Sequence, residues 1–429
     1  MPKKAPITST ISPDAAAAML ALRRRRIVRA LREACAKRGR SAWIVGGALR
    51  DAAMGRPPGE IREIDAAVDG DPEPIARDLE NAGLGRAVFL SKDRPGPRVY
   101  RVAAAGTELD LAALHGDGSG PPASVTIAED LARRDFTVNA LALPVAGGPL
   151  VDPFGGAADL RRRALRGVRE RNFHEDPLRG LRAARLIATR RLIPDARLLA
   201  WSRAAAPALS GVAAERVSAE LAKMLAAPRV QPALAWARRA GLLSGALGAA
   251  VSGPAAARLA GSAGKLDAAG VRRLAPERRR RLRLAWIAGR LRLGDGGARR
   301  WLAGRRWGRR EAEEVATLVG LARRAAASPT GDDAWRWVLD AGPLAADAAR
   351  LAAIETPRAT GAARRLAALA RRPRRSLDVT GRDVMEWTDL PPGPRVGSLL
   401  QALAVAAAAG HVASRRQAKQ WLLAAVGAT

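Results

Sequence analysis

Two acidic residues in the segment REIDAAV, Glu63 and Asp65, stand two positions apart and could hold a metal ion together. On an extended strand alternate side chains point to the same face, so this spacing brings both carboxylates to one side. Mg²⁺ is a hard cation that prefers oxygen ligands, and such a pair suits it. The same pattern also describes a solvated strand face, so the pair needs support from other residues.

A glycine turn comes shortly before this pair, in the segment VGGALRD. Gly46 and Gly47 lie between a strand-like run and a helix-like run, so their backbone N–H groups could approach a phosphate at the start of the helix. Arg50 would sit near the turn and pair with that phosphate, and Asp51 ends the motif. Since Gly-Gly turns are common, this motif alone is a weak signal.

Two later segments place polar groups among apolar ones. In ELDLAAL, Asp110 stands between two leucines, where a carboxylate faces either solvent or a site. It could serve as a metal ligand or as the base for a hydroxyl group. In EDLARRDFTVNALAL, Arg134 suits a phosphate and Asn139 suits a sugar hydroxyl, with Asp135 between them.

The segment HEDPLRGLRAARL predicts a helix on which one acid and three arginines recur at every third residue. This spacing forms a charged stripe that winds slowly around the helix axis. The stripe could line a binding pocket, or it could be a solvated face held by i, i+3 ion pairs. Its members are Asp176, Arg179, Arg182 and Arg185.

The elements that would position these groups lie in the first 155 residues. A first helix is followed by a strand, a helix, a strand, a helix and three strands. This order predicts a small mixed sheet with helices packed on it. After about residue 155 helical periodicity dominates, so we expect an α/β head followed by a long helical region. The expected strands lie in 41–47, 63–69, 86–91, 98–106 and 107–114, and the expected helices in 15–40, 48–55 and 71–83.

Composition narrows the class of partner. The chain has 429 residues, a formal net charge of +32 and 48% hydrophobic residues, and this excess of base indicates a polyanion such as nucleic acid. Arginine clusters such as 23–26 are either solvated helix faces or phosphate contacts. The single cysteine, Cys35, excludes a disulfide framework and suits a reducing cytoplasm. We expect no membrane span, no obligatory protein partner, and a short disordered lead in MPKKAPITSTISPD.

Taken together, the motifs resemble the class II tRNA nucleotidyltransferase and bacterial poly(A) polymerase family. VGGALRDAAMGRP resembles its glycine turn, and EIDAAV occupies its paired-carboxylate strand. RRDFTVNALA with VDPFGGAADL, EDPLRGLRAAR and ERVSAELAKML (215–225) resemble its later blocks. The resemblance is dense from about 40 to 225 and returns at 379–403, whereas 226–375 carry only generic helical signal.

This resemblance implies an α+β fold, in which a five-stranded, polymerase-beta-like nucleotidyltransferase head precedes an all-helical neck, body and tail. It implies Mg²⁺-dependent, template-independent addition of CMP and AMP, from CTP and ATP, to the 3′ end of tRNA. The basic helices would hold the acceptor end of the tRNA. The expected segments are a lead with the start of the first helix (1–25), the head (26–155), template and neck helices (156–225), a body (226–370) and an RNA-binding tail (376–429).

The resemblance also assigns roles to individual residues. Asp176 would accept from the exocyclic amine of C or A, and Arg179 would donate to a ring nitrogen or carbonyl. G and U would place an acceptor opposite the Asp176 carboxylate, so they would be rejected. The catalytic residues would be Glu63, Asp65 and Asp110, of which Glu63 and Asp65 bind two metals; the nucleotide-binding residues would be Gly46, Gly47, Arg50, Asp51, Arg134, Asp135, Asn139, Asp176, Arg179, Arg182 and Arg185.

Two positions depart from the family pattern. Glu63 stands where Asp is expected, and His115 stands where the third-carboxylate motif commonly ends in Arg. The loop after it, in 115–124, is short and small, which leaves open a CC-adding or an A-adding specialist. A poly(A) polymerase and an RNA-binding protein with decayed catalysis are further alternatives. The segment PPGPRVG favours the tRNA enzyme, and the retained pocket residues argue against decay.

Overall fold

The computed structural model describes residues 12–90, 98–104, 106–116, 125–248, 251, 253–372 and 377–427. The chain divides into two compact units. The first unit comprises Met1–Val212 with Ala235–Gly248, and the second comprises Ala213–Leu234 with Ala249–Thr429. The finer division into five segments remains a prediction, and the expected disordered lead, the loop at 117–124 and most of the basic linker at 371–376 lie outside the described residues.

The first unit is built on a mixed sheet with strand order β3-β4-β5-β2-β1-β6. β2 and β5 are parallel, and every other neighbouring pair is antiparallel. The alternation predicted in EIDAAV is present in its first half, because Ile64 is buried while Glu63 and Asp65 are exposed, whereas Ala66, Ala67 and Val68 are all buried. The strands are β1 (Ala42–Val45), β2 (Glu63–Val68), β3 (Ala87–Phe89), β4 (Val99–Ala104), β5 (Thr107–Ala113) and β6 (Ala142–Pro144).

The five predicted strands are present, but the described part of the sheet has six strands rather than five. The additional strand, β6, has only three residues and ends in Pro144, so its sequence carries little strand signal. It pairs with β1 at the edge of the sheet, where a proline without an N–H group is tolerated.

The predicted single helix over 15–40 is wrong. α1 (Pro13–Ala21) passes into a short 3₁₀ turn (Leu22–Arg24), and α2 (Arg26–Lys37) starts after an extended Arg25. The break lets the Arg25 guanidinium bind the backbone oxygens of Pro58 and Ile61. Arg23 likewise donates to the Pro144 carbonyl, at 2.8 Å. Two members of this arginine cluster therefore tie the fold together, a role that the sequence reading did not consider.

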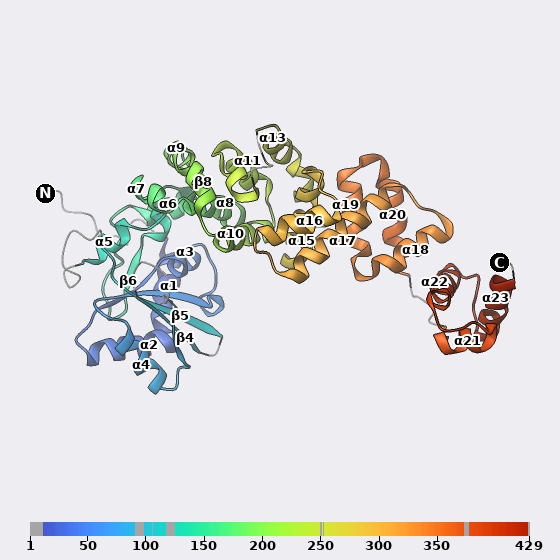
Figure 1. Cartoon of the computed structure of the whole chain (residues 1–429). Helices are drawn as coiled ribbons and strands as arrows, with labels where there is room; N and C mark the ends of the chain where they lie inside the picture. Colours follow the sequence, from blue (N-terminus) through green and yellow to red (C-terminus); the bar gives the residue numbers. More distant parts are fainter. Residues whose placement is uncertain are drawn as a thin grey trace. The chain divides into compact units, whose positions relative to one another are not determined.

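The other helices of the first unit cover the sheet and follow it. α2 and α4 pack against each other beside the sheet (Figure 1). A Phe136, Phe173 and Trp201 cluster, with ring centroids about 6 Å apart, joins the end of the sheet to the later helices. These helices are α3 (Gly47–Ala53), α4 (Glu73–Asn81), α5 (Ile127–Ala132), α6 (Gly156–Arg162), α7 (Arg171–Glu175), α8 (Leu178–Arg190), α9 (Ala196–Ala205) and α12 (Leu242–Leu247); the two-residue strands β7 (Ala164–Leu165) and β8 (Ile193–Pro194) pair with each other.

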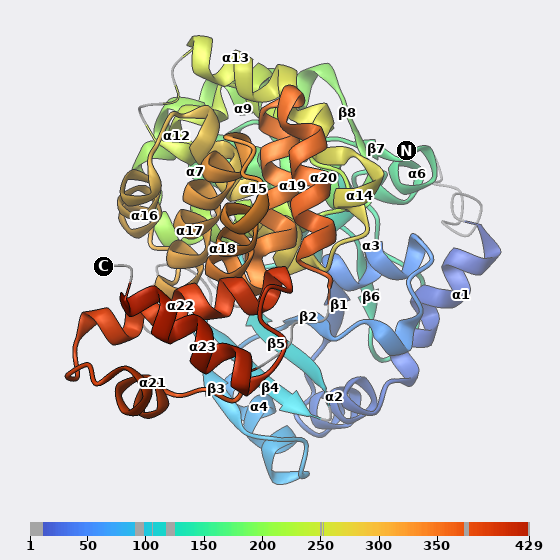
Figure 2. The same cartoon turned by 90° about the vertical axis from the view of Figure 1, so that its right-hand side faces the viewer.

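The second unit is helical throughout its described residues, as predicted. α15, α17 and α19 pack against one another, and α20 packs on α19 (Figure 2). The last three helices share a small core of their own that includes Val384, Leu403 and Leu422. The helices are α10 (Ala214–Ala226), α13 (Gly253–Ser262), α14 (Ala269–Arg272), α15 (Pro276–Arg290), α16 (Asp295–Gly304), α17 (Arg309–Ala326), α18 (Gly331–Ala341), α19 (Ala345–Glu355), α20 (Thr360–Leu369), α21 (Gly381–Thr388), α22 (Pro394–Ala409) and α23 (Arg415–Gly427), and α11 (Gln231–Arg239) runs from the second unit into the first.

A buried guanidinium on α15 holds segments of the second unit together through hydrogen bonds. Arg283 is fully buried, and it donates to the backbone oxygens of Leu225, Pro228 and Leu266, among others, and to the Asp267 carboxylate. Burial lowers the pKa of Arg283 to about 10, although the nearby Asp267 carboxylate opposes this shift. Among the described residues, no helix combines the length and the apolar character needed to cross a bilayer.

Candidate functional site

The carboxylates predicted to bind metal lie where β2 and β5 run side by side. The parallel register places Glu63 opposite Glu108 and Asp65 opposite Asp110. Partners in register share one face of a sheet, so all four carboxylates lie on the same side. The leucines that flank Asp110 are fully buried on the other face. The structure therefore brings Asp110 to the predicted pair.

The glycine turn lies directly against Asp65. Gly46 has φ +72°, a left-handed conformation that favours glycine, and it precedes the first residue of α3. A Cβ atom added at Gly46 would come within 3.0 Å of Arg134 Nη1 and 3.3 Å of Asp65 Oδ2. The turn, the carboxylate and the guanidinium thus meet at one point, where a side chain at position 46 would be both strained and crowded.

Asp65 is accessible to solvent, yet protein atoms crowd its carboxylate. This desolvation raises the pKa of Asp65, and the negative charges of Asp110 and Glu63 raise it further, whereas Arg134 opposes the shift. A carboxylate in this situation lacks a sufficient positive partner within the protein. A cation at this point would supply the missing charge.

Arg101 is the partner of Asp110, and the sequence reading missed it. It lies on β4 opposite Asp110, and its Nε and Nη2 atoms donate to the two carboxylate oxygens at 2.7 and 2.8 Å. Its Nη1 atom lies 2.7 Å from Glu108 Oε2. Arg101 is one of two arginines in the strand-like run RVYRVAAAG, and its place one hairpin before Asp110 is the signal that could have revealed it.

The oxygen donors at this point suit a magnesium ion that also binds other ligands. No group of three or more His, Cys, Asp or Glu side chains in the described ranges is arranged to hold a metal alone. Glu63 and Asp65 remain as oxygen donors on one face, while Arg101 occupies both oxygens of Asp110. Mg²⁺ commonly uses one or two protein carboxylates together with substrate phosphates and water. The residues therefore fit a magnesium ion that arrives with a phosphate, and they do not form a closed protein cage.

Arg50 and Asp51 form a buried ion pair behind the glycine turn. Arg50 Nε donates to Asp51 Oδ1 at 2.9 Å, and Arg50 Nη1 donates to Asn139 Oδ1 at 2.6 Å. Arg190, another residue that the sequence reading missed, donates to Asp51 through its Nε atom at 2.9 Å. Burial alone would raise the pKa of Asp51, but Arg190 and Arg50 outweigh it and hold that pKa below its usual value. Because Arg50 is buried and committed to these partners, its contact with a triphosphate remains a prediction.

The same network continues to α8 through Asp135. Asn139 Nδ2 donates to Asp135 Oδ1 at 2.8 Å, and Arg182 lies 3.8 Å from the other Asp135 oxygen. Burial would raise the pKa of Asp135, but the charge of Arg182 and the Asn139 hydrogen bond lower it overall. The structure thus joins Arg50, Asn139, Asp135 and Arg182, which the sequence predicted from three separate motifs.

The predicted helical stripe begins later than expected. α8 starts at Leu178, and Asp176 is extended, with φ −137° and ψ 90°, so placing Asp176 on the helix was wrong. Pro177 explains the difference, because a proline disfavours helical geometry in the residue before it. Arg179, Arg182 and Arg185 do lie on α8, as predicted.

Arg179 has one buried donor without a partner. Its Nη1 and Nη2 atoms donate to the backbone oxygens of Arg134 and Arg133, at 3.2 and 2.7 Å, whereas its Nε atom is buried without a hydrogen bond. Asn172, which the sequence reading missed, donates to the same Arg134 oxygen at 2.9 Å, and its own Oδ1 atom is also unsatisfied. A donor and an acceptor left unpaired around one carbonyl are typical of a place that a polar ligand or water completes.

His115 is held near this region. Its backbone N–H donates to Asp130 Oδ1 at 3.2 Å, and Asp130 also accepts from Arg134. Desolvation lowers the pKa of His115, and the Arg133 charge adds to this effect. The loop that follows begins inside the described residues and continues at 117–124, outside them.

Comparisons with known proteins agree with this geometry. A family model described as the poly A polymerase head domain matches residues 42–166. The CCA-adding enzyme of Geobacillus stearothermophilus is 31% identical over 412 residues, which cover 88% of this chain and 91% of that protein. A CC-adding tRNA nucleotidyltransferase of Geobacter sulfurreducens is 39% identical over 212 residues, but the match spans only 46% of that protein and 49% of this chain. The solved structure of the Bacillus stearothermophilus CCA-adding enzyme in complex with CTP superposes with a TM-score of 0.70, at 26% identity, over 97% of this chain and 99% of that chain.

Proposed function

This chain belongs to the family of tRNA nucleotidyltransferases and poly(A) polymerases, and from that premise we propose that it builds or repairs the CCA end of tRNA. The substrates would be CTP, ATP and a tRNA that lacks part of its 3′ end. The 3′-hydroxyl of the RNA would attack the α-phosphate in line, and pyrophosphate would leave. The proposed enzyme would act in the cytoplasm, a reducing compartment that the single, buried Cys35 suits.

The observation that carries the reaction type is the meeting of Gly46, Asp65 and Arg134. Glu63 and Asp65 would hold Mg²⁺, which supplies charge stabilisation for the entering and leaving oxygens when it is bound. The backbone N–H groups of the turn at Gly46 would face a phosphate, and the Arg134 guanidinium that lies against the turn would pair with it. Arg101 would keep the Asp110 carboxylate fixed beside Asp65.

The choice of base would rest on Asp176 and Arg179. The free Nε donor of Arg179 suits the N3 or O2 acceptor of cytosine or the N1 acceptor of adenine. Asp176 would accept from the amine that both bases carry. Two backbone oxygens anchor Arg179, so a base would reach its buried Nε atom only if the surrounding side chains move. The same pair serves both bases, so the order C, C, A would come from the position of the RNA end.

The CC-adding specialist is the second candidate, because a protein with that name is 39% identical over half of this chain. A poly(A) polymerase is the third, because the head-domain model carries that description. The purified chain should be incubated with labelled CTP or ATP and three tRNAs that end before CCA, after C and after CC.

CCA addition predicts that all three tRNAs are extended and that extension then stops. Extension that stops after the second C identifies a CC-adding enzyme, and A addition to the CC end alone identifies an A-adding enzyme. Long A tails on an unstructured RNA would instead identify a poly(A) polymerase. Complete inactivity of soluble, folded protein in the presence of Mg²⁺ would support decayed catalysis.

A further inference from the structure

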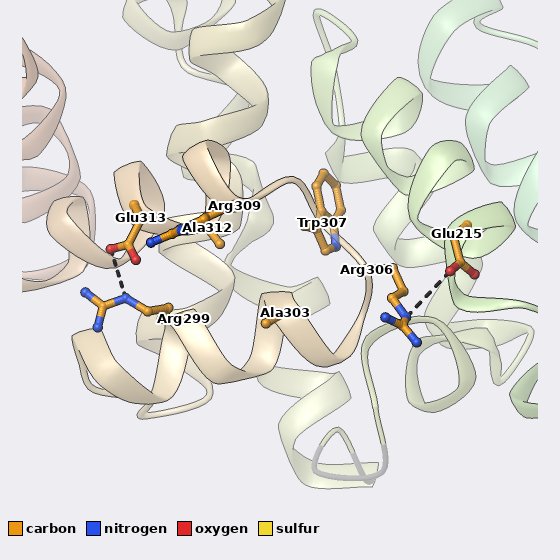
Figure 3. Close-up of a pocket in the computed structure, with 8 residues that line it drawn as sticks. All are labelled: Glu215, Arg299, Ala303, Arg306, Trp307, Arg309, Ala312 and Glu313. Carbon is orange, nitrogen blue, oxygen red and sulfur yellow. Dashed lines mark hydrogen bonds and ion pairs between the residues drawn. The ribbon is translucent and has the colours of Figure 1, made fainter.

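The second unit contains a pocket of about 540 Å³ where α16 ends and α17 begins (Figure 3). Its lining includes three arginines, Arg299, Arg306 and Arg309, and one aromatic residue, Trp307. This volume lies within the range of about 300–1,000 Å³ that is usual for small-ligand sites. No motif in the sequence reading drew on these residues.

The turn that forms the pocket holds Arg306 in an unusual conformation. Arg306 has φ +58°, in the left-handed region, and its N–H donates to the Ala303 carbonyl to close the end of α16. Glycine is the usual residue at such a position because a side chain is strained there. The chain instead has an arginine next to a half-buried tryptophan, so the turn presents a guanidinium and an indole ring together.

Acids engage the three arginines of the pocket unevenly. Arg299 pairs with Glu313 at 2.8 Å, and Arg306 lies 3.6 Å from Glu215. The side chains of Arg306 and Glu215 are 71% and 65% exposed, and exposed ion pairs of this kind stabilise little. Within the part of the chain that the structure describes, Arg309 forms no ion pair or side-chain hydrogen bond. A phosphate could therefore compete for these guanidinium groups.

The arginines of a second cluster, at 278–281, are all bound to other groups of the protein. Arg278 binds Asp347, Arg280 binds Glu311, and Arg281 binds Glu314. Arg279 donates to the backbone oxygens of Ala226 and Leu274, among others. The positive charge of that cluster is already neutralised or bound within the protein, whereas the pocket leaves charge available beside an aromatic face.

We propose that this pocket binds an unpaired nucleotide of the RNA substrate, with its phosphates on Arg299, Arg306 and Arg309 and its base or ribose against Trp307. In Figure 3 the Arg299–Glu313 pair lies to one side of Trp307 and the Arg306–Glu215 pair to the other. Stacking on an aromatic ring and a cationic track for the backbone are the two elements of single-strand recognition. This proposal rests on the proposed function only in taking RNA as the substrate.

The test is the affinity of the full-length chain for a labelled tRNA transcript without CCA, measured by fluorescence anisotropy at several salt concentrations. Trp307→Leu removes the aromatic face but keeps bulk, and it should weaken binding by roughly 10-fold, whereas Trp307→Phe should stay within about twofold of the unchanged protein. Arg309→Gln should weaken binding and reduce the salt slope by about one.

Arg310→Gln is the matched control, because Arg310 neighbours Arg309 on α17 but lies outside the pocket, with a side chain that is 93% exposed. It should leave the salt slope unchanged. Thermal unfolding of each variant separates a binding loss from a folding loss, and the Trp307→Phe variant keeps the test readable if Trp307→Leu unfolds.

Two results would overturn the proposal. In the first, Trp307→Leu and Arg309→Gln bind the transcript as tightly as Arg310→Gln does. In the second, free ATP or CTP occupies the pocket, so that these variants lose binding of the free nucleotide while tRNA binding is unchanged. If the unchanged protein binds tRNA but adds no nucleotide, the proposed function fails while this binding test remains decisive.

Discussion

Arg50 in the first unit and Arg283 in the second are both buried guanidinium groups, and different kinds of partner satisfy them. Arg50 binds the carboxylate of Asp51 and the amide oxygen of Asn139, and Arg190 shares Asp51 with it. Arg283 binds mainly backbone oxygens from α10, the turn that follows it and the segment before α14. In both places burial lowers the arginine pKa.

The two buried arginines differ in how easily their partners can change. A network of side chains can change partners when a ligand brings phosphates or hydroxyl groups, because rotamers can adjust. Backbone oxygens packed around α15 cannot move in this way, so Arg283, which they hold, serves stability. Arg179 is also held by backbone oxygens, but these belong to the turn after α5 beside the candidate site. We therefore expect substitutions in the first network to affect activity and substitutions at Arg283 to affect folding.

The largest expected effect is on activity, at Asp65. Asp65→Asn keeps the shape of the side chain but removes the charge that a magnesium ion needs, so nucleotide addition should fall by roughly 10³-fold, equivalent to about 4 kcal/mol. The free energy of unfolding should be unchanged or higher, because Asp65 is crowded by Asp110 and Glu63. Label incorporation and urea unfolding on the same preparation measure both, and substantial activity in the folded variant would remove Asp65 from the site.

For Arg283→Met we expect a loss of stability and little change in activity. Its removal leaves several buried backbone oxygens without a donor, so the free energy of unfolding should drop by about 3–5 kcal/mol. Activity per folded molecule should be nearly unchanged at low temperature. Arg280→Met is the matched control on the same helix, because its pair with Glu311 is partly exposed and should contribute no more than about 1 kcal/mol. Equal losses for both variants would contradict the structural role of Arg283.

Glu63 should show a graded effect on activity. Glu63→Ala removes one of two oxygen donors and should lower nucleotide addition by roughly 10²-fold, whereas Glu63→Asp should retain or raise it. The extra methylene of glutamate shifts its carboxylate by about 1.5 Å, which a folded rotamer or a water molecule must compensate. Full activity in Glu63→Ala would mean that Asp65 and Asp110 suffice.

The smallest expected effect is a difference in how the two buried networks depend on pH. The pKa of Asp51 is held below its usual value of 3.8, so its ion pairs stabilise the fold above that value and are lost as the pH falls through the lower, folded-state pKa. The destabilisation caused by Asp51→Asn, about 3 kcal/mol at pH 7, should therefore shrink below about pH 4. The destabilisation caused by Arg283→Met should persist. Urea unfolding at pH 7, 4 and 3 tests this, and a cost of Asp51→Asn that stays constant would contradict it.

The sequence predicted the parts of the head that depend on local patterns. Neighbouring residues are enough to predict the alternation of Glu63, Ile64 and Asp65, the glycine turn before α3 and the five strands β1 to β5. Local patterns failed where a distant partner decides the structure. The extended Arg25 that splits the first helix binds oxygens of Pro58 and Ile61, which lie more than 30 residues away.

The same limit applies to the candidate site. Arg190 reaches Asp51 across 139 positions of sequence, and no spacing rule indicates such a pair. Arg101 and Asp110 are closer in sequence, but their pairing depends on the register of β4 on β5. The arginine clusters show most clearly that local patterns are not enough. Similar runs of arginine either form ion pairs and hydrogen bonds inside the protein or line a pocket, according to what packs around them.

The most direct test of the account is the incorporation of each of the four labelled nucleotides into a tRNA that lacks CCA, with the unchanged protein and with Asp65→Asn. The account predicts that CMP and then AMP are added, that GMP and UMP are not, and that Asp65→Asn abolishes addition. Addition of GMP and UMP at comparable rates, or addition that survives in folded Asp65→Asn, would contradict it.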